Sequence, residues 1–184
     1  FGVHVYLLGK VPSPKILLKA FEEVKPNLIL MVPLILEKIY KNMILRQLNK
    51  RTFKLVLNIP LLDSRIYAQI RKHLVDALGG RFREVIVGGA AMNQEVTDFL
   101  YKIKFPFTIG YGMTECGPLI SYDHNNEYVP GSCGQILKGI MKVRIDSEDP
   151  YNKVGEIQVS GENVMKGYYK NDEATQNVFT EDGW

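Results

Sequence analysis

The sequence predicts an α/β fold: a mostly parallel sheet with helices on both faces, followed by antiparallel strands of a β-barrel-like subdomain or a small sheet. Over residues 1–109, short apolar runs alternate with amphipathic segments of helical length, which is the order found in parallel sheets. After about residue 118, β-rich runs are separated by Gly, Asp, Pro and Asn, a pattern typical of antiparallel strands. We place the division at residue 122, so that the two parts cover 1–122 and 123–184.

The first elements are predicted from the residues at their ends. We expect a short strand over 3–8, then a helix that Ser13 caps, that Pro14 opens and that ends before Pro26. The inward face of this helix carries Leu17, Phe21 and Val24. Residues 28–32 form an apolar run without alternation, which predicts a strand covered on both faces.

Two further helices are predicted before the next strand. Pro33 opens the first, and its inward positions recur at helical spacing: Leu36, Ile39, Tyr40, Met43 and Ile44. The second has Ser64 as its candidate cap and Gly79-Gly80 as its end. The apolar stripe of this second helix is Ile66, Ile70 and Leu74.

The remaining segments complete the α/β order. A strand at 84–87 runs into the turn Gly88-Gly89-Ala90-Ala91, and Asn93 then caps a helix. The inward residues of that helix are Val96, Phe99, Leu100 and Ile103. A strand at 106–109 ends the α/β part. The predicted antiparallel strands cover 136–145 and 154–160.

The composition is that of an ordinary globular protein, with 46% apolar and 23% charged residues in 184. No apolar run reaches the roughly 18 residues that a membrane-spanning helix needs. The start, FGVHVYLLGK, is interpreted as a strand from within a protein and not as a signal peptide. Two cysteines and three histidines have no metal-ligand spacing, and so few cysteines favour a reducing, cytoplasmic location.

Charge is distributed unevenly along the chain. Residues 1–83 hold 15 basic and 5 acidic residues, whereas residues 145–184 hold 3 basic and 9 acidic residues. One interpretation is that these charges lie on solvated faces. The other is a basic surface near an anionic ligand or lipid headgroups, which allows peripheral association with the inner face of a membrane. Nothing in the pattern resembles a nucleic-acid-binding module.

The strand at 106–109 leads into TIGYGMTECGP, residues 108–118, where glycines surround three chemically useful side chains. Tyr111 could stack on a flat heterocycle, Thr114 could bond a phosphate oxygen, and Glu115 could hold a divalent metal that bridges phosphates. If the two strands that end in glycine turns are neighbours, this pattern describes a nucleotide-triphosphate site. Either turn alone is equally well a tight turn, and neither is a phosphate loop of the G-x-x-x-x-G-K-[ST] type.

Several motifs resemble one family. YGMTE at 111–115 resembles the signature of the adenylate-forming enzymes, which include acyl-CoA synthetases, luciferase-like proteins and peptide-synthetase adenylation domains. GGAAM at 88–92 resembles their adenine-side turn. Three more motifs follow in the family's order: GSCGQIL at 131–137, GEIQVSGENVMKGYYKN at 155–171 and DGW at 182–184. The stretch KPNLILMVPLILEKIYKN, 25–42, is most similar to the long-chain fatty acyl-CoA synthetases.

The resemblance implies an ATP-dependent acid–thiol ligase. Such an enzyme activates a carboxylic acid, here a long-chain fatty acid, with ATP to give an acyl-adenylate, and then transfers the acyl group to coenzyme A. It implies ATP, Mg²⁺ and coenzyme A as the cofactor and co-substrates, and the fatty acid as the other partner. It also implies that 1–122 is the end of the large AMP-binding subdomain and 123–184 the start of the β-barrel-like one.

The site residues that the resemblance implies lie in both glycine turns. Gly89, Ala90 and Ala91 would line the adenine and acyl side, and Gly110 would let the strand end approach the adenylate. The other implied roles are stacking on adenine by Tyr111, backbone contact with the acyl-adenylate by Gly112 and Met113, phosphate contact by Thr114, and Mg²⁺ binding by Glu115. Thr114 and Glu115 are the candidate catalytic pair. Tyr168 and Tyr169 are interpreted as barrel residues.

The family's phosphate loop, ribose aspartate, hinge and C-terminal domain are not in these residues, so we expect a fragment without turnover on its own.

The sequence leaves two alternatives to a long-chain fatty acyl-CoA synthetase open. The acid could be aryl, short-chain or an amino acid within the same superfamily. From the residues alone, a nucleotide-binding module without ligase chemistry is the second alternative. The oligomeric state and the acyl chain length are not predicted.

Overall fold

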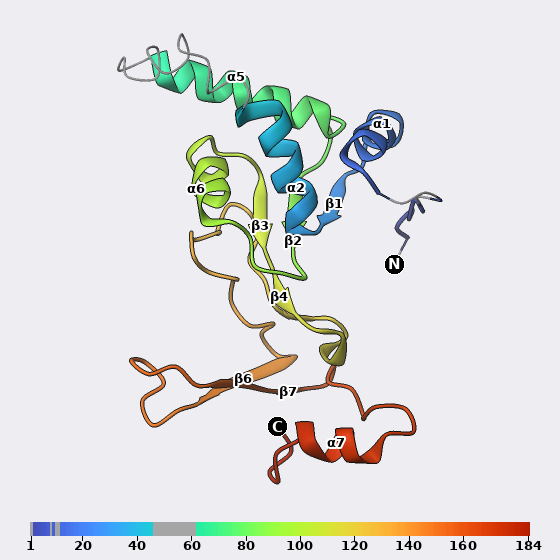
Figure 1. The fold of residues 1–184 in the computed structure, drawn as a ribbon, viewed down its shortest axis with the longest axis vertical. Helices are drawn as coiled ribbons and strands as arrows, with labels where there is room; N and C mark the ends of the chain where they lie inside the picture. The colour runs from blue at the N-terminus through green and yellow to red at the C-terminus, as the bar shows by residue number, and fades with distance from the viewer. Residues whose placement is uncertain (1, 8, 10–11, 46–61) are drawn as a thin grey trace. The chain divides into compact units, whose positions relative to one another are not determined.

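The computed structural model describes residues 2–7, 9, 12–45 and 62–184 (Figure 1). It divides into two compact units. The first unit holds Phe1–Thr108 and His124–Ser132, and the second holds Ile109–Asp123 and Cys133–Trp184. Each unit is therefore assembled from two separate stretches of the chain. The predicted division at residue 122 refers to subdomains of the family fold and stays a prediction.

A three-stranded parallel sheet forms the centre of the first unit. Its strands are β1 (Leu28–Met31), β2 (Glu84–Val87) and β3 (Phe107–Ile109), in the order β1-β2-β3. In the β1–β2 pair Ile29 lies opposite Val85, and the Val85 N–H donates to the Pro106 carbonyl at 2.9 Å on the other side. The predicted parallel order is confirmed, and the two strands that end in glycine turns are neighbours.

The prediction that β1 is covered on both faces is wrong for the described residues. Ile29 and Met31 are buried, whereas Leu28 and Leu30 are 50% and 74% exposed. An apolar run shows that both faces of a strand suit an apolar environment, but it does not supply the element that covers the second face. In the described part of the chain, the face of β1 that carries Ile29 and Met31 is buried and the face that carries Leu28 and Leu30 is exposed.

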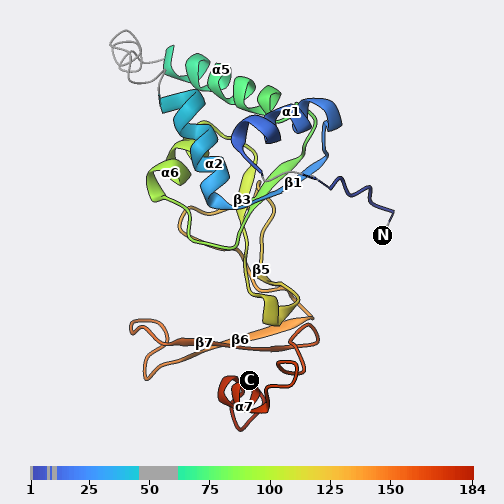
Figure 2. The ribbon, with the colours of Figure 1, turned by 45° about the vertical axis from the view of Figure 1, so that its right-hand side comes forward.

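The described residues of the first unit include the helices α1 (Pro14–Val24), α2 (Pro33–Tyr40), α5 (Leu62–Ala77) and α6 (Gln94–Lys102). Figure 2 shows α1 beside α2 and α5, both of which it contacts. Ser13 caps α1 by accepting the Ile16 N–H, and Asn93 caps α6 by accepting the Val96 N–H at 3.2 Å. Both caps were predicted, because a side-chain oxygen at this position satisfies an amide that the helix leaves free.

Two local predictions are corrected. Residues 3–7 form no strand and are exposed, since no described strand lies beside them to complete their hydrogen bonds. Ser64 is the third residue of α5 and not its cap, because α5 already includes Leu62. After Tyr40, α2 continues as one π-helical turn over Lys41–Leu45, which keeps Ile44 buried as predicted.

Aromatic rings join three of these helices. Phe99 of α6 lies 5.3 Å from the ring of Tyr40 in α2 and 6.4 Å from the ring of Tyr67 in α5. The α2–α6 pair also has a polar contact, in which the Asn93 N–H donates to the Glu37 carboxylate at 2.9 Å. These contacts fix α6 directly after the glycine turn of β2.

The segment 124–132 returns to the first unit and is anchored to β2. Glu84, a buried carboxylate, accepts hydrogen bonds from the Asn125 backbone N–H at 3.0 Å and from its Nδ2 at 3.1 Å. The Tyr128 ring packs 4.9 Å from the ring of Phe107 in β3. A buried carboxylate with several donors is satisfied, so this segment is held by polar as well as apolar contacts.

The second unit contains two antiparallel pairs and one helix. Strand β4 (Tyr111–Gly112) pairs with β5 (Leu119–Ser121), and β6 (Met141–Asp146) pairs with β7 (Glu156–Gly161). The helix α7 (Asp172–Val178) is capped by Asn171. The core of this unit is formed by Cys116, Ile120 and Met141. The antiparallel strands predicted at 136–145 and 154–160 correspond to β6 and β7, which pair in one two-stranded sheet, although β6 begins at Met141 and not at 136. No helix among the described residues has the length and apolar character of a membrane span.

Candidate adenylate-binding site

The YGMTE segment forms a tight reverse turn in the second unit. Tyr111 and Gly112 belong to β4, and Thr114–Cys116 form a single 3₁₀ turn. Gly112 must be glycine, because a Cβ at this position would overlap the carbonyl oxygen of Pro118 on the returning strand. Gly117 ends the turn in the left-handed region, with φ of 64°. The glycines thus close the turn sharply enough to leave Thr114 and Glu115 at its tip.

The loop after β7 holds this turn in place. Asn163 donates from Nδ2 to the carbonyl oxygens of Cys116, at 2.6 Å, and Leu119, at 2.9 Å. The Met165 N–H donates to the Glu115 carbonyl at 2.7 Å. Three carbonyl groups of the turn are therefore satisfied by residues almost fifty positions further along the chain, which fixes its backbone.

The side chains of the turn differ in their exposure to solvent. Met113 and Thr114 are exposed, and Glu115 is half-buried. Gly110 and Tyr111 are half-buried, and the Tyr111 ring packs against the core cluster of Cys116, Ile120 and Met141. An exposed hydroxyl and a half-buried carboxylate are therefore carried by consecutive residues, on a backbone that the core and the Asn163 loop hold.

One other described residue donates a hydrogen bond to the Glu115 carboxylate. The Tyr168 hydroxyl donates to Glu115 Oε1 at 2.7 Å. This hydrogen bond, followed by one from the backbone N–H of Glu115 itself, lowers the pKa of Glu115 below its usual value, because both bonds stabilise the ionised carboxylate. The same bond to a carboxylate raises the pKa of Tyr168, so the tyrosine stays protonated as a donor.

Tyr168 was missed as a site residue, since it was interpreted as part of a barrel. Tyr168 and Glu115 are 53 positions apart, and no spacing rule connects residues at that distance. The one usable signal is that GYYKN at 167–171 belongs to the same ordered set of motifs as YGMTE.

A cavity of about 310 Å³ lies beside Glu115 within the second unit. Its wall is formed by residues of the turn, of β7 and of the C-terminal segment, among them Glu115, Gln158, Val159, Tyr168, Phe179 and Trp184. The wall combines apolar side chains with a few polar ones, which is the usual character of a small-ligand site.

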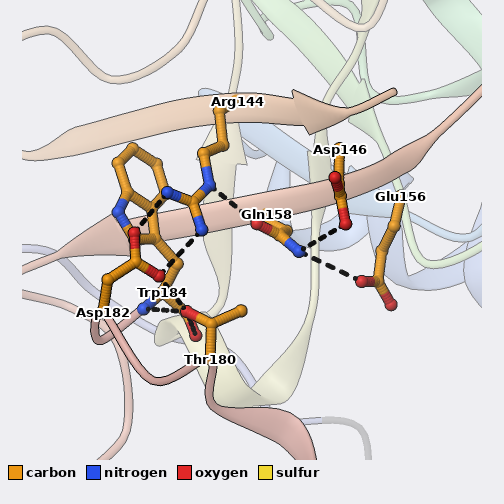
Figure 3. Close-up of polar contacts among 7 residues, drawn as sticks. All are labelled: Arg144, Asp146, Glu156, Gln158, Thr180, Asp182 and Trp184. Atoms are coloured by element: carbon orange, nitrogen blue, oxygen red, sulfur yellow. Dashed lines mark hydrogen bonds and ion pairs between the residues drawn. The ribbon is translucent and has the colours of Figure 1, made fainter. Parts of the chain in front are cut away.

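Arg144 of β6 organises the C-terminal part of this wall (Figure 3). It donates from Nε to Gln158 at 2.7 Å and from Nη2 to Asp182 at 2.9 Å, and its Cζ lies 4.5 Å from the centre of the Trp184 ring. Hydrogen bonds from Arg144, and then from Thr180, lower the pKa of Asp182 to about 2. Two residues of the DGW motif are thus bound to β6 by one guanidinium group.

The other predicted turn lies in the first unit. Gly88 follows β2 and donates its N–H to the Met31 carbonyl at 3.2 Å. Gly89 has φ of 89°, a conformation that side chains disfavour, and Gly89, Ala90 and Ala91 are all exposed. The structure thus places these three residues in one unit, and Gly110–Glu115 in the other.

The oxygen atoms that Glu115 and Thr114 offer as metal ligands suit Mg²⁺. Among the described residues, no group of three or more His, Cys, Asp and Glu side chains could form a metal cage. Glu115 offers Oε2, which receives no hydrogen bond from another described residue, and Thr114 offers a hydroxyl beside it. Mg²⁺ is usually bound by one or two carboxylates together with water and substrate phosphates, so a single carboxylate fits this ion.

Comparison with known proteins identifies the family of the chain. A family model described as "AMP-binding enzyme" matches residues 1–169. Long-chain-fatty-acid–CoA ligase 1 of Saccharomyces cerevisiae is 28% identical over 181 residues, covering 89% of this chain and 26% of the relative. 4-Coumarate–CoA ligase 1 of Glycine max is 36% identical over 109 residues, covering 53% of this chain and 37% of the relative.

Solved structures show the same fold. A malonyl-CoA ligase, in a ternary product complex with methylmalonyl-CoA and AMP, superposes with a TM-score of 0.63 at 21% identity, over 93% of this chain and 32% of that one. O-succinylbenzoate coenzyme A synthetase from Bacillus subtilis, in complex with ATP and a magnesium ion, gives 0.62 at 21% identity, over 94% of this chain and 30% of that one. The chain spans only 26% to 37% of the length of the relatives named here. The family model matches more than nine-tenths of the length of this chain. The chain therefore belongs to the AMP-binding, adenylate-forming enzyme family.

Proposed function

We propose that the protein carrying this chain activates a long-chain fatty acid with ATP to an acyl-adenylate, and then forms a thioester with coenzyme A. The proposal rests on the arrangement of residues at the tip of the YGMTE turn. There Thr114 and Glu115 are consecutive residues of one 3₁₀ turn, on a backbone fixed by Asn163 and Met165, with one carboxylate oxygen of Glu115 not bonded to another described residue.

The proposed roles divide between binding and charge neutralisation. Tyr111 stacks on the adenine, and the backbones of Gly110, Gly112 and Met113 approach the adenylate. Thr114 donates its hydroxyl to a phosphate oxygen, and Glu115 binds Mg²⁺. When bound, Mg²⁺ neutralises the phosphate charge that would otherwise repel the attacking carboxylate. The remaining turn, Gly89 to Ala91, is proposed to line the adenine and acyl side.

The first half-reaction, adenylate formation with release of pyrophosphate, needs no general base. A fatty acid is already ionised at neutral pH, so it can attack the α-phosphorus without losing a proton. The chain's contribution is to orient the carboxylate and the nucleotide and to stabilise charge. A nucleophilic Ser, Cys or His constellation is not required for either half-reaction.

The extent of the alignments supports a long-chain fatty acid as the substrate. The alignment with the yeast long-chain ligase spans 89% of this chain, whereas the alignment with the soybean 4-coumarate ligase spans 53%. The second candidate is an aryl acid, which the higher identity of the soybean alignment, 36% against 28%, favours. We further propose that 1–122 and 123–184 belong to the family's large and β-barrel-like subdomains, with helices on both faces of the large sheet.

Acid-dependent exchange of pyrophosphate into ATP tests the proposal on the full-length protein. The panel should contain saturated acids from acetate to long chains, coumarate and an amino-acid mixture. Exchange that increases with aliphatic chain length is expected. Exchange with coumarate alone would assign the aryl acid instead, and binding of ATP without exchange on any acid would mean that ligase chemistry is absent.

A further inference from the structure

Glu115 is held at two points by one short segment of the second unit. The Met165 N–H donates to its backbone carbonyl at 2.7 Å, and the Tyr168 hydroxyl donates to its carboxylate Oε1 at 2.7 Å. A glutamate with free rotation loses entropy when it binds a ligand. Here the segment 165–168 restricts both the backbone and the carboxylate before any ligand arrives.

The position of Tyr168 is itself fixed by α7. Its backbone N–H donates to Thr175 Oγ1 at 2.9 Å, and the Thr175 hydroxyl in turn donates to the Asn171 carbonyl at 2.9 Å. Gly167 has φ of 149°, and a Cβ there would lie 2.8 Å from Thr175 Cγ2. The segment therefore packs on α7 so closely that only glycine fits before Tyr168.

We propose that Tyr168 is a positioning residue for Glu115 in metal binding: its hydroxyl holds Oε1 and leaves Oε2 for the divalent cation. The inference rests on the proposed function, in which Glu115 is the metal ligand. Carboxylates that bind metals are commonly hydrogen-bonded by a second residue, which fixes their orientation, and loss of that residue typically weakens metal binding by about 10- to 100-fold. Tyr168 is the described residue whose side chain makes this contact.

The next residue provides a matched control. Tyr169 is 87% exposed, and its hydroxyl makes no hydrogen bond to a described residue. Its ring has the Lys170 ammonium 5.2 Å from the centre, a contact that a phenylalanine ring keeps. Tyr169→Phe therefore removes the same atom as Tyr168→Phe, one position away, without changing Glu115.

The experiment measures metal binding directly. Mn²⁺ is titrated into the full-length protein in the presence of a non-hydrolysable ATP analogue, and bound Mn²⁺ is followed by electron paramagnetic resonance. The proteins compared are wild type, Tyr168→Phe, Tyr169→Phe, Glu115→Gln and the double variant Tyr168→Phe/Glu115→Gln. We expect Tyr168→Phe to weaken Mn²⁺ binding by about 10-fold, Tyr169→Phe to leave it unchanged, and the double variant to match Glu115→Gln.

Each contrary result has one meaning. If Glu115→Gln weakens Mn²⁺ binding and Tyr168→Phe does not, the positioning role is overturned and the proposed function stands. If Tyr168→Phe weakens Mn²⁺ binding by the same factor in the wild type and in the Glu115→Gln background, the tyrosine acts at another place. That result also overturns the positioning role. If Tyr168→Phe lowers the melting temperature but leaves the Mn²⁺ affinity unchanged, Tyr168 stabilises the fold and has no role in metal binding. Unchanged binding in Glu115→Gln would instead remove the metal role from the proposed function.

Discussion

The guanidinium group of Arg144 lies over the indole ring of Trp184, with Cζ 4.5 Å from the ring centre, while it donates two hydrogen bonds to Asp182 (Figure 3). Thr180 closes the same segment, because its hydroxyl donates to Asp182 Oδ1 at 2.8 Å and accepts the Trp184 N–H at 2.8 Å. One arginine of β6 thus fixes the last residues of the chain, which also line the cavity beside Glu115.

Acid should release this segment within a defined pH range. The pKa of Asp182 is lowered from 3.8 to about 2 in the folded protein, so its contribution to stability is complete above pH 4 and is lost as the pH falls through 2. Fluorescence of Trp184, the one tryptophan of the chain, should change over that range in the wild type. Asp182→Asn should lose this transition, and a wild-type transition that persists in the variant would assign it to another group.

Gly112→Ala should destabilise the protein by about 1–3 kcal/mol, the usual cost of forcing an extra methyl into a packed site. The added Cβ would overlap the Pro118 carbonyl oxygen and push β4 away from β5. Gly9→Ala is the matched control, because a Cβ at Gly9 meets nothing within 4 Å and its backbone is not left-handed. Denaturant unfolding of both variants measures the difference, and equal midpoints would contradict the close approach.

Asn163→Ala should cost about 1–3 kcal/mol of stability, because it leaves the Cys116 and Leu119 carbonyl groups without their donor. It should also weaken ATP binding, since these carbonyls fix the turn that carries Thr114. The control is Asn152→Ala, which removes an exposed hydrogen bond to Asp149 and should stay within about 0.5 kcal/mol. Calorimetric titration with ATP, alongside unfolding, separates the two effects. Intact ATP affinity in Asn163→Ala would show that the turn does not depend on this clamp.

Glu115→Gln should lower the rate of adenylate formation by about 10²–10³, the usual loss when one charge-stabilising group is removed. The substitution keeps the shape of the side chain and its contact with Tyr168 while removing the charge. Glu156→Gln is the control, because Glu156 is another carboxylate that lines the same cavity. Pyrophosphate exchange measures both rates. A wild-type rate in Glu115→Gln would remove this residue from the site.

Tyr111→Ala should weaken ATP binding more than fatty-acid binding, because stacking on adenine is its proposed role. The ring also packs against the core of Cys116, Ile120 and Met141, so a lower melting temperature is expected as well. Competition experiments that measure both affinities on folded protein separate these effects. A selective loss of fatty-acid affinity would contradict the stacking role.

Local signals predicted most of the first unit. Ser13 and Asn93 were identified as caps because a short polar side chain before an amphipathic run satisfies free amides. The same signal could have found α7, where Asn171 precedes Asp172 and Glu173 at the start of the helix. It failed at Ser64, since a candidate cap within a longer helical pattern does not exclude an earlier start.

Contacts between distant residues could not be predicted from the sequence. The turn at 111–115 was identified from its glycines and polar residues, but the groups that hold it, Asn163 and Tyr168, are 47 and 53 positions away from their partners. Likewise, the apolar composition of 28–32 suited a strand but did not reveal that Leu28 and Leu30 are exposed. Which residue meets which at that range depends on the assembled fold.

The return of residues 124–132 to the first unit has a consequence for how the protein is made and dissected. The chain passes between the units three times, so neither unit is a continuous stretch that one cut could release. During synthesis, β2 is complete long before Asn125 and Tyr128 emerge from the ribosome to meet Glu84 and Phe107. The first unit therefore cannot finish folding until the first stretch of the second unit, Ile109–Asp123, has also been translated, and the YGMTE turn lies within that stretch.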